Sequence, residues 1–200
     1  MAKQHPRGGA RDKGPPYPVS DSFGWVFTDT AVNAIVFCGL AMQWMRPTIL
    51  SYLAEASPQK AFSTFETFYP HYLSEHKDET SRMLHFVGTV LIILYSVSDP
   101  RLMLSSGISA LVGFGVADLT RSLDTGYVEF AIILSVYFFV SKRMMGDDFK
   151  NAFVLPVCGY AFAWAGHFFF ELNQPATFTY PTYSLVGDFN MAFDTLKSFF

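Results

Sequence analysis

The stretch AFVLPVCGYAFAWAGHFFFE, residues 152–171, ends a long apolar segment with a histidine and a glutamate, His167 and Glu171. A helix that crosses a bilayer needs about 20 mostly apolar residues, and this stretch has that length. Ionisable side chains in such segments are costly and are usually functional. Because the two residues are one helical turn apart, they share a face and can act on the same ligand.

Four further apolar segments precede this one in the sequence, at about residues 24–46, 82–98, 102–117 and 126–141. Half of the 200 residues are hydrophobic and 16% are charged, whereas about a quarter are charged in a typical soluble protein. The sequence therefore predicts an all-α fold, a multi-span transmembrane helical bundle. A soluble bundle with buried core helices is the alternative.

The chain divides into three regions by composition. Residues 1–23 are rich in proline, glycine and charge, and we expect a flexible arm. Residues 24–54 are expected to form an added transmembrane or interfacial helix, and residues 55–200 a membrane domain. Within that domain, the aromatic and polar stretch 55–81 is expected to lie at the membrane interface. Residues 176–200 are expected to form a turn and a short interfacial helix.

Composition also excludes several functions. The formal net charge is −3 and no basic stripe follows the sequence, so nucleic acid is not an expected partner. The two cysteines, Cys38 and Cys158, lie in apolar segments without neighbouring cysteines, which indicates buried small side chains and not a disulfide or a zinc site. Pro156 is expected to kink the fifth segment, because proline removes a backbone donor.

Counting membrane crossings places five ionisable residues at one face of the bundle: His76, His85, Glu129, His167 and Glu171. Imidazole and carboxylate groups with open coordination positions suit non-haem ferrous iron. We expect His76 to fold back from a loop, since Thr80 or Ser81 is a suitable first residue for the next helix. Two further histidines, His5 in the arm and His71 beside Pro70, have no such case. From spacing alone, each histidine of the set could equally be a hydrogen-bonding group at a helix end.

Three sequence blocks resemble the signature of the 2-hydroxy-fatty-acid dioxygenase family of membrane proteins: FETFYPHYLSEH, RMLHFVGT and GYAFAWAGHFFFELNQPATFTYPTYSLVGDF. The resemblance covers about residues 61–190. It implies a multi-span protein of the endoplasmic reticulum that uses Fe(II) for the alpha-oxidation of 2-hydroxy fatty acids. Carried over by position, it implies metal ligands at His76, His85 and His167, and a functional glutamate at Glu171.

The sequence departs from the family pattern at three positions near these residues. Ser81 stands where the family usually has asparagine, and Leu172 and Gln174 stand where it usually has lysine and arginine. Losing two cations removes a grip on a fatty-acid carboxylate, because arginine holds carboxylates in a bidentate fork. A second interpretation therefore stays open, an accessory subunit of a larger membrane complex. In that case another organelle, such as the mitochondrial inner membrane, is the alternative location.

Overall fold

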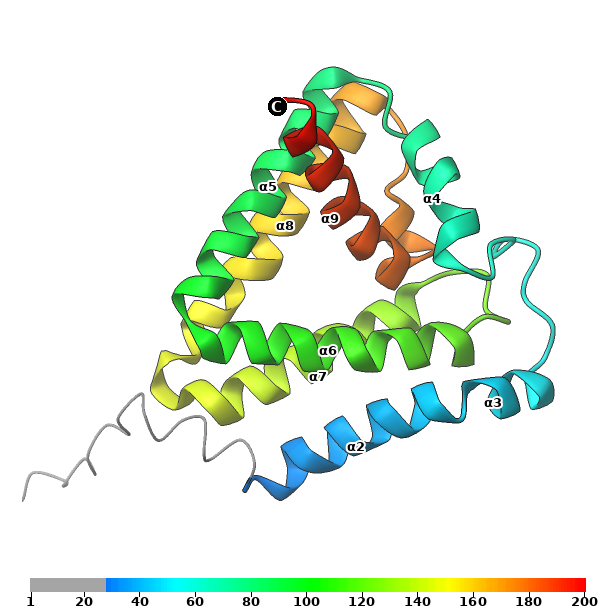
Figure 1. The fold of residues 1–200 in the computed structure, drawn as a ribbon, viewed down its shortest axis with the longest axis vertical. Coiled ribbons are helices and arrows are strands. Elements are labelled where there is room, and N and C mark those ends of the chain that lie inside the picture. Colours follow the sequence, from blue (N-terminus) through cyan, green and yellow to red (C-terminus); the bar gives the residue numbers. More distant parts are fainter. Residues whose placement is uncertain (1–27) are drawn as a thin grey trace, which may run out of the picture.

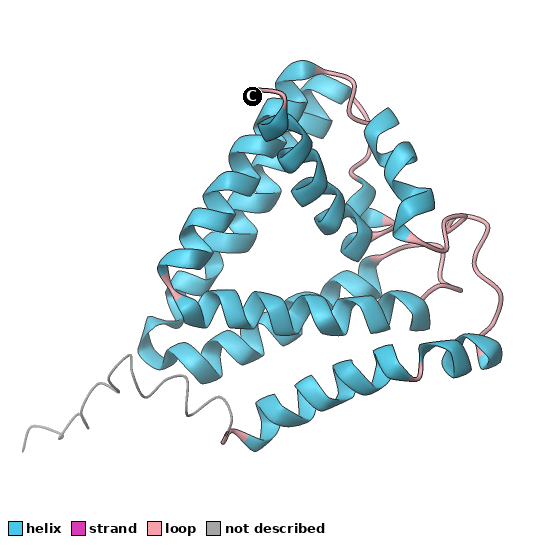
Figure 2. Ribbon diagram, viewed as in Figure 1, coloured by secondary structure: helices cyan, strands magenta, loops and turns pink. Residues whose placement is uncertain are grey.

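The computed structural model describes residues 28–200, and every regular element in that range is a helix (Figures 1 and 2). The α-helices are α2 (Thr30–Trp44), α3 (Arg46–Tyr52), α4 (Phe65–Ser74), α5 (Glu79–Ser98), α6 (Pro100–Leu119), α7 (Tyr127–Met145), α8 (Val154–Gly166) and α9 (Pro181–Lys197). Three shorter helices join them: η1 (Gly146–Phe153), the π-helix η2 (His167–Glu171) and η3 (Ala176–Phe178). The predicted all-α fold is confirmed. The predicted arm and His5 lie outside the described residues.

Two pairs of packed helices form the frame of the molecule. Helix α5 packs along α8, and α6 packs along α7. Figure 1 shows that the two pairs meet at one corner and diverge from it, with α9 and α4 on the open side of the angle. Helix α9 contacts both α5 and α4, so it fills the space between the α5–α8 pair and the α6–α7 pair.

Three helical stretches are long and apolar enough to cross a membrane, judged by length and composition: Glu79–Ser98, Pro100–Leu119 and Tyr127–Glu171. The last is a continuous stretch of 45 residues. It contains both the fourth and the fifth predicted segments, and the chain changes direction between them at η1 (Figure 1). Helix α2 is apolar but shorter. Candidate membrane-spanning helices thus make up most of the frame, as predicted for a multi-span protein.

Two local expectations need correction. The N-cap of α5 is Asp78, whose side chain accepts hydrogen bonds from Thr80 N and Ser81 N; a carboxylate satisfies these amides and also interacts favourably with the helix dipole. Pro156 does not kink a helix, because α8 begins at Val154 and proline is tolerated in a first turn. The carbonyl of Ala152 instead accepts a hydrogen bond from the Tyr137 hydroxyl, at 2.8 Å.

The added N-terminal segment forms α2 and α3 and lies against α6. Asp29 caps α2 at one end and pairs with Arg143 at the end of α7. At the other end, Arg46 Nε lies 2.6 Å from Asp118 Oδ2. An ion pair therefore fixes each end of α2 to the α6–α7 hairpin. The tail forms α9, a helix of 17 residues, which is longer than the short interfacial helix that we expected.

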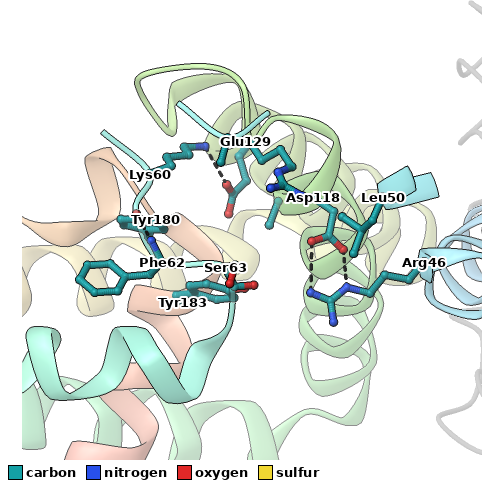
Figure 3. A pocket seen from close by; sticks show the side chains of 12 residues that line it. Arg46, Leu50, Lys60, Phe62, Ser63, Asp118, Glu129, Tyr180 and Tyr183 are labelled. Carbon is teal, nitrogen blue, oxygen red and sulfur yellow. Dashed lines mark hydrogen bonds and ion pairs between the residues drawn. The ribbon is translucent and has the colours of Figure 1, made fainter. Parts of the chain in front are cut away.

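A buried ion pair joins the α6–α7 turn to the segment before α4 (Figure 3). Lys60 Nζ lies 3.7 Å from Glu129 Oε2 and donates to the carbonyl of Thr120. Glu129 Oε1 also accepts from the backbone N–H of Thr182 in the first turn of α9, at 2.9 Å. Burial lowers the pKa of Lys60, and the nearby Glu129 carboxylate opposes that shift. Glu129 therefore holds the start of α9 and the Lys60 segment together.

We predict that Lys60→Met destabilises the protein by about 3 kcal/mol, because removing one partner leaves a buried charge unpaired. The double variant Lys60→Met/Glu129→Gln should recover most of that loss. Glutamine removes the charge and still accepts the hydrogen bond from Thr182. Thermal unfolding in mild detergent measures both variants. A single variant as stable as the wild type would contradict the assignment.

Candidate metal centre

Three buried histidines from three different elements meet at one end of the α5–α8 pair. His76 lies in the turn between α4 and α5, His85 in α5, and His167 at the start of η2. Each is 2–3% exposed. The ring centroids are 4.6–5.1 Å apart, and one potential ligand atom from each ring lies within 4.8 Å of the others. A single ion can therefore contact all three rings.

The hydrogen bonds at Nδ1 decide which nitrogen each ring presents. The Nδ1–H of His76 donates to the carbonyl of Tyr72 at 2.6 Å, and that of His85 donates to Asp188 Oδ1 at 2.6 Å. The Nδ1–H of His167 donates to Asn173 Oδ1 at 2.7 Å. A carbonyl or carboxylate oxygen can only accept, so the proton is on Nδ1 and the lone pair is on Nε2.

Two of these Nε2 atoms, those of His76 and His85, are buried and have no hydrogen-bond partner. A buried polar atom without a partner is destabilising unless something binds it. Burial, reinforced by the neighbouring His85, also lowers the pKa of His76 to about 3, so its ring is neutral at physiological pH. A neutral imidazole with a lone pair that makes no hydrogen bond is the form that coordinates a transition metal, so the donor set fits a metal ion.

The orientation of His167 depends on an unusual stretch of backbone. After η2, Leu172 adopts a left-handed conformation with φ of 54°, which is uncommon for a residue other than glycine or asparagine. This turn brings Asn173 back to the His167 ring. The amide of Asn173 has one possible orientation, because its Nδ2 donates to the carbonyl and the carboxylate of Glu75, at 2.9 and 3.0 Å. Its oxygen is therefore left to accept from His167.

Tyr72 and Asp188 link two of the three histidines. The carbonyl of Tyr72 accepts from His76, while its hydroxyl donates to Asp188 Oδ1 at 2.6 Å, the atom that also accepts from His85. Asp188 reaches this position because Gly187 lies against the Tyr72 ring. A Cβ at residue 187 would lie 2.9–3.0 Å from three ring atoms. The carboxylate partner of His85 thus comes from α9.

A second glycine, Gly166, allows α5 and α8 to pack closely beside the histidines. A Cβ on Gly166 would lie 2.7 Å from Ser81 Oγ and 3.4 Å from a ring carbon of His85. Only a residue without a side chain lets α8 approach α5 this closely. Gly166 immediately precedes His167, so this contact fixes the distance between His167 and His85.

The other residues singled out from the sequence lie outside the cluster. Glu171 Oε1 accepts from the backbone N–H of Asp78 at 2.9 Å and so ties the end of η2 to the start of α5. Glu129, which we expected at the same membrane face as the histidines, pairs with Lys60 near the first turn of α9 and is not part of the cluster. His71 is exposed and stacks on Phe62.

Sequence reasoning did not identify Tyr72, Asn173 and Asp188 as members of the site. Asn173 and Asp188 lie within the sequence blocks that carry the family resemblance, but they carry no local signal of their own. From the sequence alone, Asn173 is typical of a loop and Asp188 of the exposed face of a helix. A partner for each Nδ1 was nevertheless to be expected, since metal-binding histidines almost always donate their other N–H to an acceptor.

A large apolar cavity is lined by one of the three histidines, His85. Its volume is about 460 Å³, and it lies between α5, α6, α7, α8 and α9. His85, Asp188, Thr89 and Tyr160 are among its polar lining residues, whereas aliphatic residues from Ile92 to Val97 and from Leu155 to Pro156 line other parts. Lysine and arginine are absent from its lining, which lies within the described chain. The cavity thus combines potential metal ligands with a mostly apolar wall.

The fold and the site together define a helical protein with candidate membrane spans and a buried three-histidine cluster that can hold a metal ion. Residues 62–199 match the family model described as 2-hydroxy-palmitic acid dioxygenase Mpo1-like. The chain belongs to this family, which confirms the resemblance seen in the sequence. No curated protein and no solved structure gives a significant match. Family membership implies a 2-hydroxy fatty acid dioxygenase, and the cluster is compatible with a metal site.

We predict that Asp188→Asn weakens metal binding by about 10- to 100-fold, the usual effect of changing a group that orients a metal-binding histidine. Asparagine has nearly the same shape but no charge. Asp194→Asn is the matched control, because Asp194 lies on the same helix and accepts from Tyr69 at 2.9 Å but contacts no clustered histidine. Metal titration of the two purified variants measures the difference, and equal affinities would contradict the role of Asp188.

Proposed function

We propose that the protein is a membrane-embedded Fe(II)-dependent dioxygenase that performs alpha-oxidation of 2-hydroxy fatty acids. The observation that carries this proposal is the convergence of three buried imidazoles, each oriented through Nδ1, one of which, His85, also lines an apolar cavity. His76, His85 and His167 are the proposed ligands. The family resemblance adds the endoplasmic reticulum as the proposed location.

The proposed ligands favour a substrate with two oxygen donors. Three neutral imidazoles leave the charge of a divalent ion uncompensated and leave coordination positions open. A 2-hydroxy acid offers a carboxylate and an adjacent hydroxyl. When bound, the iron would supply the redox chemistry by which one dioxygen converts the acid to carbon dioxide, water and an acid one carbon shorter, breaking the bond between C1 and C2.

The cavity has the dimensions of a long acyl chain. Its lining on α5 runs from His85 to Val97, which corresponds to about 18 Å of helix at about 1.5 Å per residue. One leaflet of a bilayer contributes about half of a hydrocarbon core of about 30 Å. Several of the lining residues are also exposed, among them Ile93, Val97 and Met103. A chain can therefore enter sideways from membrane lipid.

Glu171 is proposed as a positioning residue and not as a fourth ligand. Its carboxylate is bonded to the backbone N–H of Asp78, the cap of the helix that carries His85. Because Glu171 is the last residue of the π-helix that begins with His167, this hydrogen bond joins the two ligand-bearing elements. In this role it holds His167 and His85 in register.

The alternative, an accessory subunit without catalysis, is favoured by one observation. Helix α2 and the segment that follows it lie outside the family match, and several of their side chains, Phe37, Trp44 and Tyr52 among them, are highly exposed. Such a surface can contact other membrane subunits or lipid. Metal content and turnover separate the two functions.

We predict that purified wild-type protein retains iron, and that His167→Ala abolishes iron retention and the conversion of 2-hydroxypalmitate to an acid one carbon shorter. His71→Ala is the control, because His71 is exposed and outside the cluster. Elemental analysis and product detection by mass spectrometry give the two measurements. A wild-type protein that binds no iron, with His167→Ala disrupting assembly with other chains, would overturn the enzyme in favour of the accessory subunit.

A further inference from the structure

The cavity has an unsatisfied hydroxyl near its polar end. Tyr160 lines the cavity together with His85 and Asp188, and its hydroxyl makes no hydrogen bond with any other described residue. Tyr160 is partly buried, and a tyrosine hydroxyl that leaves water usually finds a partner. The other cavity tyrosine, Tyr137, does so through the carbonyl of Ala152. The free hydroxyl of Tyr160 is therefore available to a ligand in the cavity.

The position of Tyr160 on α8 connects it to the proposed metal centre. Tyr160 precedes His167 by seven residues, about two helical turns, so both lie on the same face of the helical stretch. Asp188 lines the same cavity and accepts its hydrogen bonds from His85 and Tyr72, not from Tyr160. The ring itself is fixed by Phe130 and Trp164, with centroid separations of 5.2 and 5.5 Å.

Within the described residues, the cavity offers a substrate carboxylate no cationic side chain. Lysine and arginine are absent from the cavity lining. The residues after Glu171 supply no cation either, since Leu172 is 81% exposed to the surroundings and residue 174 is a glutamine. A 2-hydroxy acid that binds a metal through its hydroxyl and one carboxylate oxygen leaves its second carboxylate oxygen free. That oxygen needs a hydrogen-bond donor in the cavity.

We propose that the Tyr160 hydroxyl donates a hydrogen bond to this second carboxylate oxygen and so sets the preference of the cavity for acids over neutral lipids. The proposal rests on the proposed function, because it needs the substrate head at the histidines. Tyr160 is in this role a substrate-binding residue that replaces a cation. A hydrogen bond to a charged oxygen is among the stronger ones in proteins.

The test compares two ligands of the same chain length in the absence of oxygen: 2-hydroxypalmitate, and 1,2-hexadecanediol, which keeps the hydroxyl but has no carboxylate. In metal-loaded Tyr160→Phe, we expect affinity for 2-hydroxypalmitate to fall by about 10- to 100-fold, with a far smaller change for the diol. Trp164 fluorescence reports binding, since its ring contacts Tyr160. Phenylalanine keeps both ring contacts, and thermal unfolding and bound metal verify that the variant is folded.

Tyr137→Phe is the comparison, because it removes a hydroxyl that is already bonded within the protein. It should change both affinities together and lower thermal stability, without altering the ratio between acid and diol. A Tyr160→Phe variant with the wild-type ratio would overturn the role of Tyr160 and leave the proposed function intact. A metal-loaded wild type that binds neither ligand would overturn the proposed function, and the role of Tyr160 with it.

Discussion

Three hydrogen bonds at the Nδ1 atoms of His76, His85 and His167 determine what the centre of this protein can do. Each acceptor is of a different kind: a backbone carbonyl, a carboxylate and a side-chain amide. Each comes from an element other than the one that carries its histidine, or from a turn that folds back on it. The packing of α4, α9 and the turn after η2 therefore orients the three rings so that one nitrogen of each lies within 4.8 Å of the others.

The same packing gives the cavity its two ends. The α5–α8 and α6–α7 pairs diverge from a corner where Tyr137, Leu102 and Leu155 form an apolar cluster. The histidines lie at the other end of the α5–α8 pair. A ligand in this space meets the ionisable side chains His85 and Asp188 on one part of the wall and mostly apolar side chains elsewhere. Such an arrangement orients an amphiphile without many specific contacts, because the apolar chain and the polar head each have one favourable environment.

The sequence predicted the helices and the three clustered histidines because both leave strong signals: apolar length and a recognisable residue order. It did not predict the ion pair of Glu129 with Lys60, since counting crossings assumes helices that run side by side, whereas the α5–α8 and α6–α7 pairs here meet at an angle (Figure 1). It did not predict Asn173 or Asp188. Their contacts depend on a left-handed residue at Leu172 and on the approach of Gly187 to Tyr72, and neither follows from periodicity.

The order of these elements along the chain constrains how the centre is assembled. Asp188 belongs to α9, which follows all three histidines in the sequence. During synthesis the imidazoles therefore leave the ribosome before the carboxylate that orients His85. Until α9 docks, His85 is free to rotate and to present either nitrogen. Docking of α9 thus completes the site. A metal ion that arrives before α9 has folded would meet a site in which His85 is not yet oriented.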